Sequence, residues 1–423
     1  MFRDPKFWYR LTFYCLIYYA ALLPWQVQWL PATLAIMVAA LFGILAFDFK
    51  SKFKRLSSNS YASLMFLTYL FVVVGSIYSP ESKEAGKEVF SKLPLLAWPL
   101  LLGSMPQLSR EKIENLLRIF IFSSALAILV SFAYSLYRFF TTQDSSVFYF
   151  NELLVLLKVP AHYMGMYITF AYAIVLQRWI EGRSLFKRQS LNLVLLFVFA
   201  LSLVFIWVRM QYLLFFFVNA LIVISYLKSR FGFKKALLYF GVFSVVFAAL
   251  LAIIPGSRSR LVDTYNEIRS FEQMIDNKQT NPRKFLWSEG ATLIQENFWF
   301  GLGTGAENTA LNQRLKDVDA IFWDGKSTYQ LHEMGFNFHN SYLQVFAANG
   351  VFAFLAFLAL LILPLFRLKN HPYRNEARLF LLIVILSFLT ESMLQRQAGV
   401  LFFSFLYTLF LVLPAKSEVE NEA

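Results

Sequence analysis

Long apolar runs dominate the chain and predict membrane-spanning helices. No charged residue occurs between Leu11 and Phe47, and the stretch PWQVQWLP near its middle predicts a turn. Because about 20 apolar residues cross a bilayer as a helix, this run predicts a helical hairpin. The same criterion predicts twelve spans, near residues 11–25, 29–47, 61–79, 91–105, 116–137, 159–177, 190–208, 210–227, 236–254, 341–366, 378–394 and 398–414.

Composition agrees with this pattern. Apolar residues make up 58% of the 423 positions and charged residues only 15%, with a mean hydropathy of +0.54. A soluble globular protein is far less apolar, so the chain is predicted to be an integral membrane protein. We expect no cleavable signal at the N-terminus. The single cysteine, Cys15, excludes a disulfide framework and a thiolate metal site.

Basic residues define the predicted topology. The net charge is +13, but the charges stand in short packets between apolar runs, which argues against a nucleic-acid-binding face. With the N-terminus in the cytoplasm, 23 of the 39 lysines and arginines fall in inside segments, seven in short outside segments and nine in one long loop. Since cytoplasmic loops are enriched in lysine and arginine, this count predicts twelve spans with both termini inside.

The spans divide the chain into four parts. Residues 1–254 hold the first nine spans, residues 255–340 form a long loop outside the cytoplasm, residues 341–415 hold the last three spans, and residues 416–423 form a polar cytoplasmic tail. In the loop, RKFLWSEGATLIQENF predicts an amphipathic helix near 283–297. The predicted fold class is an all-α membrane protein whose long loop contains short helices.

Three patterns in and near the loop are weak evidence for cofactor or metal sites. GLGTG at 301–305 lacks the preceding strand and the lysine of a phosphate-binding loop, so it predicts a tight turn. Asp317, Asp319 and Asp324 lack the later ligands of a calcium loop. The four histidines show no zinc-binding spacing. We therefore expect chemistry without a metal or cofactor.

Charged and imidazole groups collect at the predicted outer ends of the spans. Arg209 is the only charged residue between Gln189 and Leu227. A charge at membrane depth needs a partner or a function, although one arginine can simply extend its guanidinium to lipid headgroups. Glu391 and Arg396 can likewise form a structural ion pair. Several cations on one face favour an anion site, and the candidates are His162, Arg209, Arg258, Arg260, Arg283, His339, Glu391 and Arg396.

Two stretches of the chain resemble motifs of one membrane-protein family. RKFLWSEGATLIQENFWFGLGTG resembles an Arg-x-x-x-Trp helix followed by a Gly-x-Gly-x-Gly turn, and FHNSYLQVFAANGVFAF resembles a His-Asn entry into a span. Together with Arg209 and ESMLQRQAG, they resemble the O-antigen ligases and the related Wzy-type polymerases. The resemblance implies a GT-C-like architecture with the active site facing the periplasm of a bacterial inner membrane.

The resemblance also implies a reaction. Members of the family move a glycan from a polyprenyl-pyrophosphate carrier to a hydroxyl, which in ligases belongs to the lipid A core. Arginine suits the leaving pyrophosphate, which gives Arg209 and Arg283 a donor-binding role, with Arg258 or Arg260 as a third contact. His339, with an ordinary pKa of about 6.5, suits the general base that removes the acceptor proton.

Other residues and other functions complete the sequence-based hypothesis. Asn340 is expected to orient the imidazole or to bind a sugar hydroxyl, with His162, Glu391 and Arg396 in support. The expected partners are the lipid-linked donor, the glycan acceptor and membrane lipids, without nucleic acid, and we expect a monomer. Two alternatives stay open: a polymerase that uses the same donor, and a transporter that binds the lipid-linked glycan without transforming it.

Overall fold

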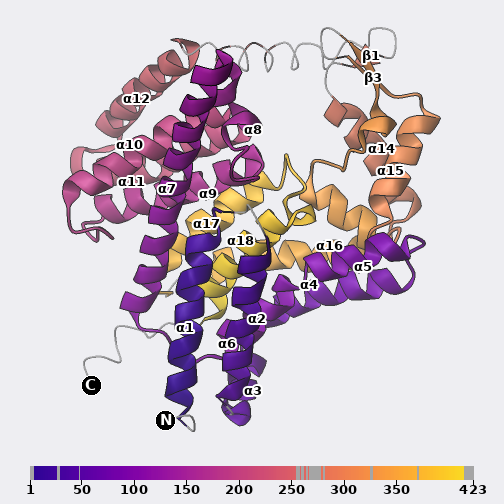
Figure 1. The fold of residues 1–423 in the computed structure, drawn as a ribbon, viewed down its shortest axis with the longest axis horizontal. Helices are drawn as coiled ribbons and strands as arrows, with labels where there is room; N and C mark the ends of the chain where they lie inside the picture. Colours follow the sequence, from indigo (N-terminus) through magenta and orange to yellow (C-terminus); the bar gives the residue numbers. More distant parts are fainter. Residues whose placement is uncertain are drawn as a thin grey trace.

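The chain folds into a largely helical structure, seen here in a computed structural model (Figure 1). The structure describes residues 4–25, 29–46, 48–253, 282–323, 327–368 and 371–413, and between them Arg258, Val262, Tyr265 and Lys278–Gln279. Asp324, Arg260 and the predicted tail 416–423 lie outside the described residues. Of the loop predicted at 255–340, residues 282–323 and 327–340 are therefore the continuously described part.

The first half of the described chain contributes twelve α-helices. They are α1 Pro5–Leu22, α2 Trp29–Leu45, α3 Phe49–Ser57, α4 Ser60–Ile77, α5 Ser82–Ser91, α6 Pro94–Ser104, α7 Arg110–Thr142, α8 Phe150–Leu153, α9 Ala161–Ile180, α10 Gln189–Ile206, α11 Arg209–Phe231 and α12 Phe233–Ile253. A 3₁₀ turn, η1 Ser145–Phe148, precedes α8.

The second half adds a small sheet and, in its described ranges, five further α-helices. The elements are β1 Lys278–Gln279, α14 Pro282–Glu296, α15 Glu307–Asp317, β2 Ile321–Trp323, β3 Thr328–Gln330, η2 Leu331–Met334, α16 Ser341–Arg367, α17 Arg374–Ser387, η3 Met393–Gln395, α18 Gln397–Tyr407 and the π-helical turn η4 Thr408–Val412.

Each predicted span overlaps one helix, but the helices differ in their ability to cross a bilayer. Among the described residues, six pass by length and apolar character: α4, α7, α10, α11, α12 and α16. A seventh candidate is a pair bent by 116° between Thr33–Leu45 and Phe49–Ser57. By contrast, α6 has 11 residues and reaches only about 16 Å at 1.5 Å per residue. The all-α membrane fold agrees with the prediction, whereas twelve crossings stay a prediction.

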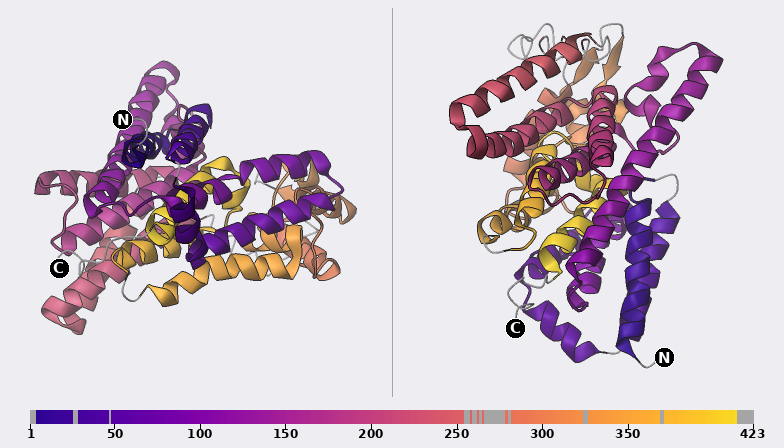
Figure 2. Two further views of the ribbon diagram at one scale, coloured as in Figure 1. Left: turned by 90° about the horizontal axis from the view of Figure 1, so that it is seen from below. Right: turned by 90° about the vertical axis from the view of Figure 1, so that its left-hand side faces the viewer.

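Helix α9 lies at the centre of the helical bundle. Seventeen of its 20 residues are buried, and its neighbours include α7, α10, α11, α17 and α18. Tyr167 donates a hydrogen bond to the carbonyl of Ala398 at 2.8 Å, and Arg178 at the opposite end of α9 forms a buried ion pair with Glu376 at 2.5 Å. Helix α9 is therefore held to the C-terminal helices at two points along its length. Figure 2 shows from two further sides that the yellow C-terminal helices lie next to the magenta helices from the middle of the chain.

The predicted amphipathic helix at 283–297 is confirmed as α14. Its apolar face packs with α15, η2 and the start of α16 around Leu286, Leu293, Leu311 and Phe338. Figure 1 shows α14, α15 and the strands together, at the end of the molecule opposite to the start of α1. The sheet, with β2 between β1 and β3, is a difference from the prediction of short helices alone. Strands of two and three residues are too short to show a periodic pattern.

The GLGTG segment forms the predicted turn and seals a break in α16. Helix α16 is interrupted at Gly350, whose φ of 75° lies in the left-handed region. The break frees the carbonyls of Ala347 and Ala348, which accept hydrogen bonds from the amides of Leu302 and Gly303 at 2.9 Å each. The turn therefore satisfies backbone groups at a kink and does not cradle a phosphate.

Substitution of Gly350 by alanine is expected to destabilise the protein. A Cβ at this position would overlap the backbone of Trp299 and Phe300. The left-handed φ adds about 1–3 kcal/mol of strain for a residue with a side chain. The thermal midpoint of the purified protein should therefore fall by several degrees.

Gly241→Ala is the matched control for the Gly350 variant. Gly241 lies inside α12, and a methyl group there would meet no described atom within 4 Å. Because alanine is the better helix former, this change should raise stability by about 0.5–1 kcal/mol. Equal midpoints for the two variants would contradict the role of the kink at Gly350.

Candidate active site

Glu391 lies at the point where several helix ends meet. It follows α17 and is almost fully buried, with 8% of its surface exposed. Its carboxylate contacts Nδ1 of His339 at 3.0 Å and Nε2 of His162 at 3.3 Å. The guanidinium of Arg283 is 3.5 Å away. The N-terminal ends of α9, α14 and α16 thus bring two imidazoles and an arginine to one carboxylate.

The backbone around His339 is held by its neighbours. His339 has a left-handed φ of 44°, and its amide donates a hydrogen bond to Oδ1 of Asn337 at 2.9 Å. The preceding Phe338 is buried, and its carbonyl accepts a hydrogen bond from the Trp287 indole at 3.0 Å. Gly290 lies against the Phe338 ring, where a Cβ would approach to 2.8 Å. Helix α14 therefore positions the loop that carries His339.

Asn340 caps the helix that follows it. Its Oδ1 accepts hydrogen bonds from the amides of Tyr342 and Leu343 at 2.9 and 3.1 Å, and its Nδ2 donates to the carbonyl of Leu389 at 3.1 Å. The side chain is thus the N-cap of α16. The described contact with Nδ1 of His339 comes from Glu391, and the two roles expected of Asn340, orienting the imidazole or binding a sugar hydroxyl, stay predictions.

Hydrogen bonds fasten the Glu391 segment to the start of α16. The Ser341 hydroxyl donates to the carbonyl of Glu391 at 2.8 Å, and the amide of Asn340 donates to the Ser392 hydroxyl at 3.1 Å. Ser392 in turn donates to Oε1 of Gln344 at 3.1 Å. These contacts hold the carboxylate and the imidazole in one rigid unit.

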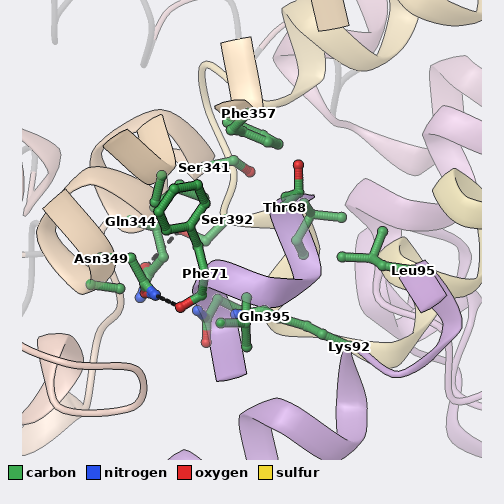
Figure 3. Close-up of a pocket in the computed structure, with 15 residues that line it drawn as sticks. Thr68, Phe71, Lys92, Leu95, Ser341, Gln344, Asn349, Phe357, Ser392 and Gln395 are labelled. Carbon is green, nitrogen blue, oxygen red and sulfur yellow. Dashed lines mark hydrogen bonds between the residues drawn. The ribbon is translucent and has the colours of Figure 1, made fainter. Parts of the chain in front are cut away.

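Figure 3 shows a pocket that Ser341, Gln344 and Ser392 of this unit help to line. Gln395, Lys92 and residues of α4 and α6 also line it. Buried Glu307 accepts hydrogen bonds from the side-chain amides of Gln344 and Gln395 at 2.8 and 3.2 Å. Burial raises the pKa of the Glu307 carboxyl, while the charge of Lys92 opposes this shift. The polar network links the site to α5 and α15.

The electrostatic balance of the site keeps Glu391 ionised. Burial raises the pKa of this carboxyl, but the hydrogen bond with His339 and the charges of His162, His339 and Arg283 outweigh burial, so that the net pKa is lowered. Nδ1 of His339 faces this carboxylate, and the histidine ring carries a second nitrogen, Nε2. The contacts around Nδ1 therefore leave the other ring nitrogen available for chemistry.

The ionised state of Glu391 predicts a pH dependence of stability. The pKa of the Glu391 carboxyl is lower in the folded protein than its unfolded value of about 4.3. The stabilisation that its ionised form gives is therefore complete above that value and is lost as pH falls through the folded pKa. Thermal midpoints of the wild type should thus fall below about pH 4. Glu391→Gln should reduce the free energy of unfolding near pH 7 by about 1–3 kcal/mol, and the midpoint of this variant should depend less on pH below about pH 4.

Glu296→Gln is the control for this measurement. Glu296 pairs with Arg314 at 2.9 Å but is half exposed, so its replacement should cost less than about 1 kcal/mol. A Glu391→Gln protein as stable as this control at neutral pH would contradict the ionised and paired state of Glu391.

The predicted arginines differ in their distance from Glu391. Arg283 contacts the carboxylate directly and keeps about a third of its side chain exposed. Arg209 is the first residue of α11, just after Trp207, which has a left-handed φ of 56° and stacks on Tyr149 with 4.2 Å between ring centroids. The nearby Gln211 amide donates to the Ser387 hydroxyl at 3.4 Å, so this end of α11 adjoins the end of α17 that leads to Glu391.

Neither Arg258 nor Arg396 is among the described ion-pair partners of Glu391. Arg258 is exposed, and the structure describes few of the residues around it. Arg396 precedes α18. The ion pairs formed by Glu391 within the described part of the chain connect it with His339, His162 and Arg283, so the Glu391–Arg396 pair considered from the sequence is not formed.

Other candidate groups are placed outside the cluster. His332 lies in η2 and His371 precedes α17. Asp317 accepts a hydrogen bond from Gln313, and Asp319 accepts one from Gln330. In the described ranges, no three His, Cys, Asp or Glu side chains are arranged to hold a metal ion.

The partnership between His339 and Glu391 was not predicted from the sequence. The two residues are 52 positions apart, and neither spacing nor periodicity indicates a pairing over that distance. A usable signal was the rarity of charge between Leu379 and Val412, where Glu391 and Arg396 are the only charged residues. Trp287 belongs to the Arg-x-x-x-Trp motif, but its hydrogen bond to the histidine loop became visible only in the structure.

A comparison with protein families gives a match over part of the chain. Residues 193–358 match the family model described as O-antigen ligase. The matched range begins in α10 and ends in α16, so it includes Arg209, Arg283 and His339, but not His162 or Glu391. A search of curated proteins gives no match.

Proposed function

We propose, from the match of residues 193–358 to the O-antigen ligase family model, that the chain is a glycosyltransferase that moves a glycan from polyprenyl pyrophosphate to a hydroxyl of the lipid A core. The observation that carries the proposal is the contact of one buried carboxylate with His339 at 3.0 Å and with Arg283 at 3.5 Å. A base and a phosphate-binding cation thereby stand side by side.

His339 acts as the general base in the proposed reaction. Its Nε2 takes the proton of the acceptor hydroxyl while the hydroxyl oxygen attacks the anomeric carbon. Glu391 holds the imidazole through Nδ1 and stabilises the imidazolium that forms, in the way a carboxylate supports a histidine base in other enzymes. His162, on the same carboxylate, helps to keep the Glu391 side chain in place.

Arg209 and Arg283 stabilise the leaving group. The bond between the anomeric carbon and the pyrophosphate oxygen breaks, and the electron pair leaves with the pyrophosphate. A guanidinium presents two parallel N–H donors that match phosphate oxygens. Direct attack on the face opposite the leaving group inverts the anomeric centre.

A polymerase is the nearest alternative, since it would use the same donor and base with a carrier-linked glycan as acceptor. A transporter would use the arginines for binding alone. One assay separates these functions: purified protein, lipid-linked glycan and lipid A core are combined, and the lipid products are analysed. A glycosylated lipid A core supports the ligase, longer carrier-linked chains support the polymerase, and the absence of any new glycosidic bond refutes both.

The proposed orientation places the site at the periplasmic face of a bacterial inner membrane, with both termini in the cytoplasm. Reporter fusions after Ser58, Ser184 and Ser229 are then expected to report the cytoplasm, and a fusion after Lys316 the periplasm. This result follows from the distribution of lysine and arginine along the chain. A cytoplasmic signal at Lys316 would place α15 and the neighbouring site on the wrong side for a lipid-linked glycan donor in the periplasm.

A further inference from the structure

A second, open cleft of about 600 Å³ lies between α5 and α15. Figure 1 shows these two helices next to each other, close to the start of α16. The cleft has the size of a small-molecule site, but its lining is mainly polar. The side chains that matter for the argument come from α5, α15 and η2, and they are Glu84, Glu88, Thr309, Asn312 and His332.

Asn312 and His332 border the cleft, and each has one buried polar atom without a described hydrogen-bond partner. The Asn312 amide nitrogen donates to the carbonyls of Asn308 and Phe336 at 2.7 and 2.9 Å, while its Oδ1 is buried and accepts no hydrogen bond from the described residues. Nδ1 of His332 is likewise buried and without a described partner. Both residues are only partly buried as a whole, and other parts of their side chains border the cleft.

The charges of the cleft argue against a second phosphate site. Glu84 pairs with Lys87 at 2.6 Å and Glu88 pairs with Lys92 at 2.6 Å, so that each carboxylate is balanced by its own lysine. Lys316 adds one cation at the edge. The described residues of the lining therefore carry too little excess positive charge to bind a pyrophosphate. They also include few apolar side chains that could contact a lipid tail. Amide, hydroxyl, imidazole and paired carboxylate groups together suit a ligand with many hydroxyls.

The cleft is directly connected with the histidine loop. Gly335, which borders the cleft, begins the stretch that reaches His339 four residues later. The hydrogen bond of Asn312 holds Phe336, and the Phe336 ring stands edge-on to the His339 imidazole with 5.5 Å between ring centroids. A chain of sugars that passes His339 therefore has a polar surface beside it in this cleft.

We infer that the cleft between α5 and α15 is a carbohydrate subsite, which binds sugar units away from the reacting atoms. The inference rests on the proposed function, since the glycan is one that the transferase uses. Both the donor and the acceptor carry such a glycan, and the experiment distinguishes them.

The test measures saccharide binding to the full chain in detergent. The probes are the core oligosaccharide released from lipopolysaccharide by mild acid and, separately, the glycan released from the polyprenyl carrier. Binding is followed by saturation-transfer NMR, and hydrogen exchange over residues 305–317 reports where the probe binds. His332→Phe and Thr309→Val remove polar atoms from the cleft with little change in shape. His371→Phe and Thr292→Val are their matched controls outside the cleft.

Each cleft variant should weaken binding by about tenfold, the effect of one lost hydrogen bond, while the controls bind as the wild type does. Protection of 305–317 by the core oligosaccharide assigns the cleft to the acceptor, and protection by the carrier glycan assigns it to the donor. No protection by either probe, or unchanged binding in both variants, would overturn the inference. Saccharide binding in a protein that forms no glycosidic bond would instead refute the transferase and keep the subsite.

Discussion

Replacement of His339 by alanine is expected to lower the transfer rate by about 10²- to 10⁴-fold, the usual contribution of a general base. The variant should still insert in the membrane and bind the donor, because Arg209 and Arg283 are unchanged. The measurement is the initial rate of glycan transfer by the purified protein, accompanied by its thermal midpoint and its affinity for the lipid-linked donor.

His371→Ala is the control for the His339 variant. His371 lies in the segment that leads into α17, where burial lowers its pKa, and it has no contact with the Glu391 cluster in the described structure. This variant should keep the wild-type rate. Full activity of His339→Ala, at an unchanged midpoint, would remove His339 from the mechanism. If His339→Ala lowers the thermal midpoint as well as the rate, His339→Gln takes its place in the comparison. This variant retains a polar side chain beside Glu391 and should be folded but slow.

Lysine is expected to fail at Arg209 and Arg283. Each substitution keeps the charge but loses the planar pair of N–H donors that matches two phosphate oxygens. We expect weaker donor binding and a transfer rate at least about tenfold lower in each case, equivalent to one lost charge-assisted hydrogen bond of roughly 1.5–3 kcal/mol. The measurements are the donor affinity, the transfer rate and the thermal midpoint, since the Arg209 stem also packs at the start of α11.

Arg314→Lys is the matched control for Arg283→Lys. Arg314 has a similar exposure, about a third of the side chain, and pairs with glutamates of α14. The Arg314→Lys variant should keep the wild-type affinity for the donor and the wild-type transfer rate. Rates equal to the wild type in the Arg209 and Arg283 variants would contradict the proposed phosphate clamp.

A chelator separates the arginine-based proposal from a metal-dependent one. EDTA should leave the wild-type rate unchanged, because the arginines are proposed to supply the positive charge that a metal ion otherwise provides. If EDTA removed the activity and a divalent cation restored it, the acidic segment with Asp317 and Asp319 would become the better candidate for the donor site.

The apolar pattern alone determined the membrane character and the helix positions. Each of the twelve predicted runs overlaps a helix, because a bilayer-length helix must satisfy its backbone internally and expose apolar side chains. The helix at Pro282–Glu296 also followed from local spacing, since one of its faces packs on a small core. The number of crossings stays a prediction, because short helices such as α6 and α18 are largely buried by their neighbours.

For the site, the residue types could be chosen from the sequence, but their pairings could not. Charge and imidazole are rare at the ends of apolar runs, so His339, Arg283, Arg209 and Glu391 were visible as candidates. Which of them touch depends on the packing of α9, α14, α16 and α17, and this packing is a sum of many weak contacts between distant segments. Tertiary structure alone therefore joined Glu391 to His339 across 52 residues and assigned Asn340 to the helix cap, because a hydrogen bond requires its two groups to lie about 3 Å apart, whatever their separation along the chain.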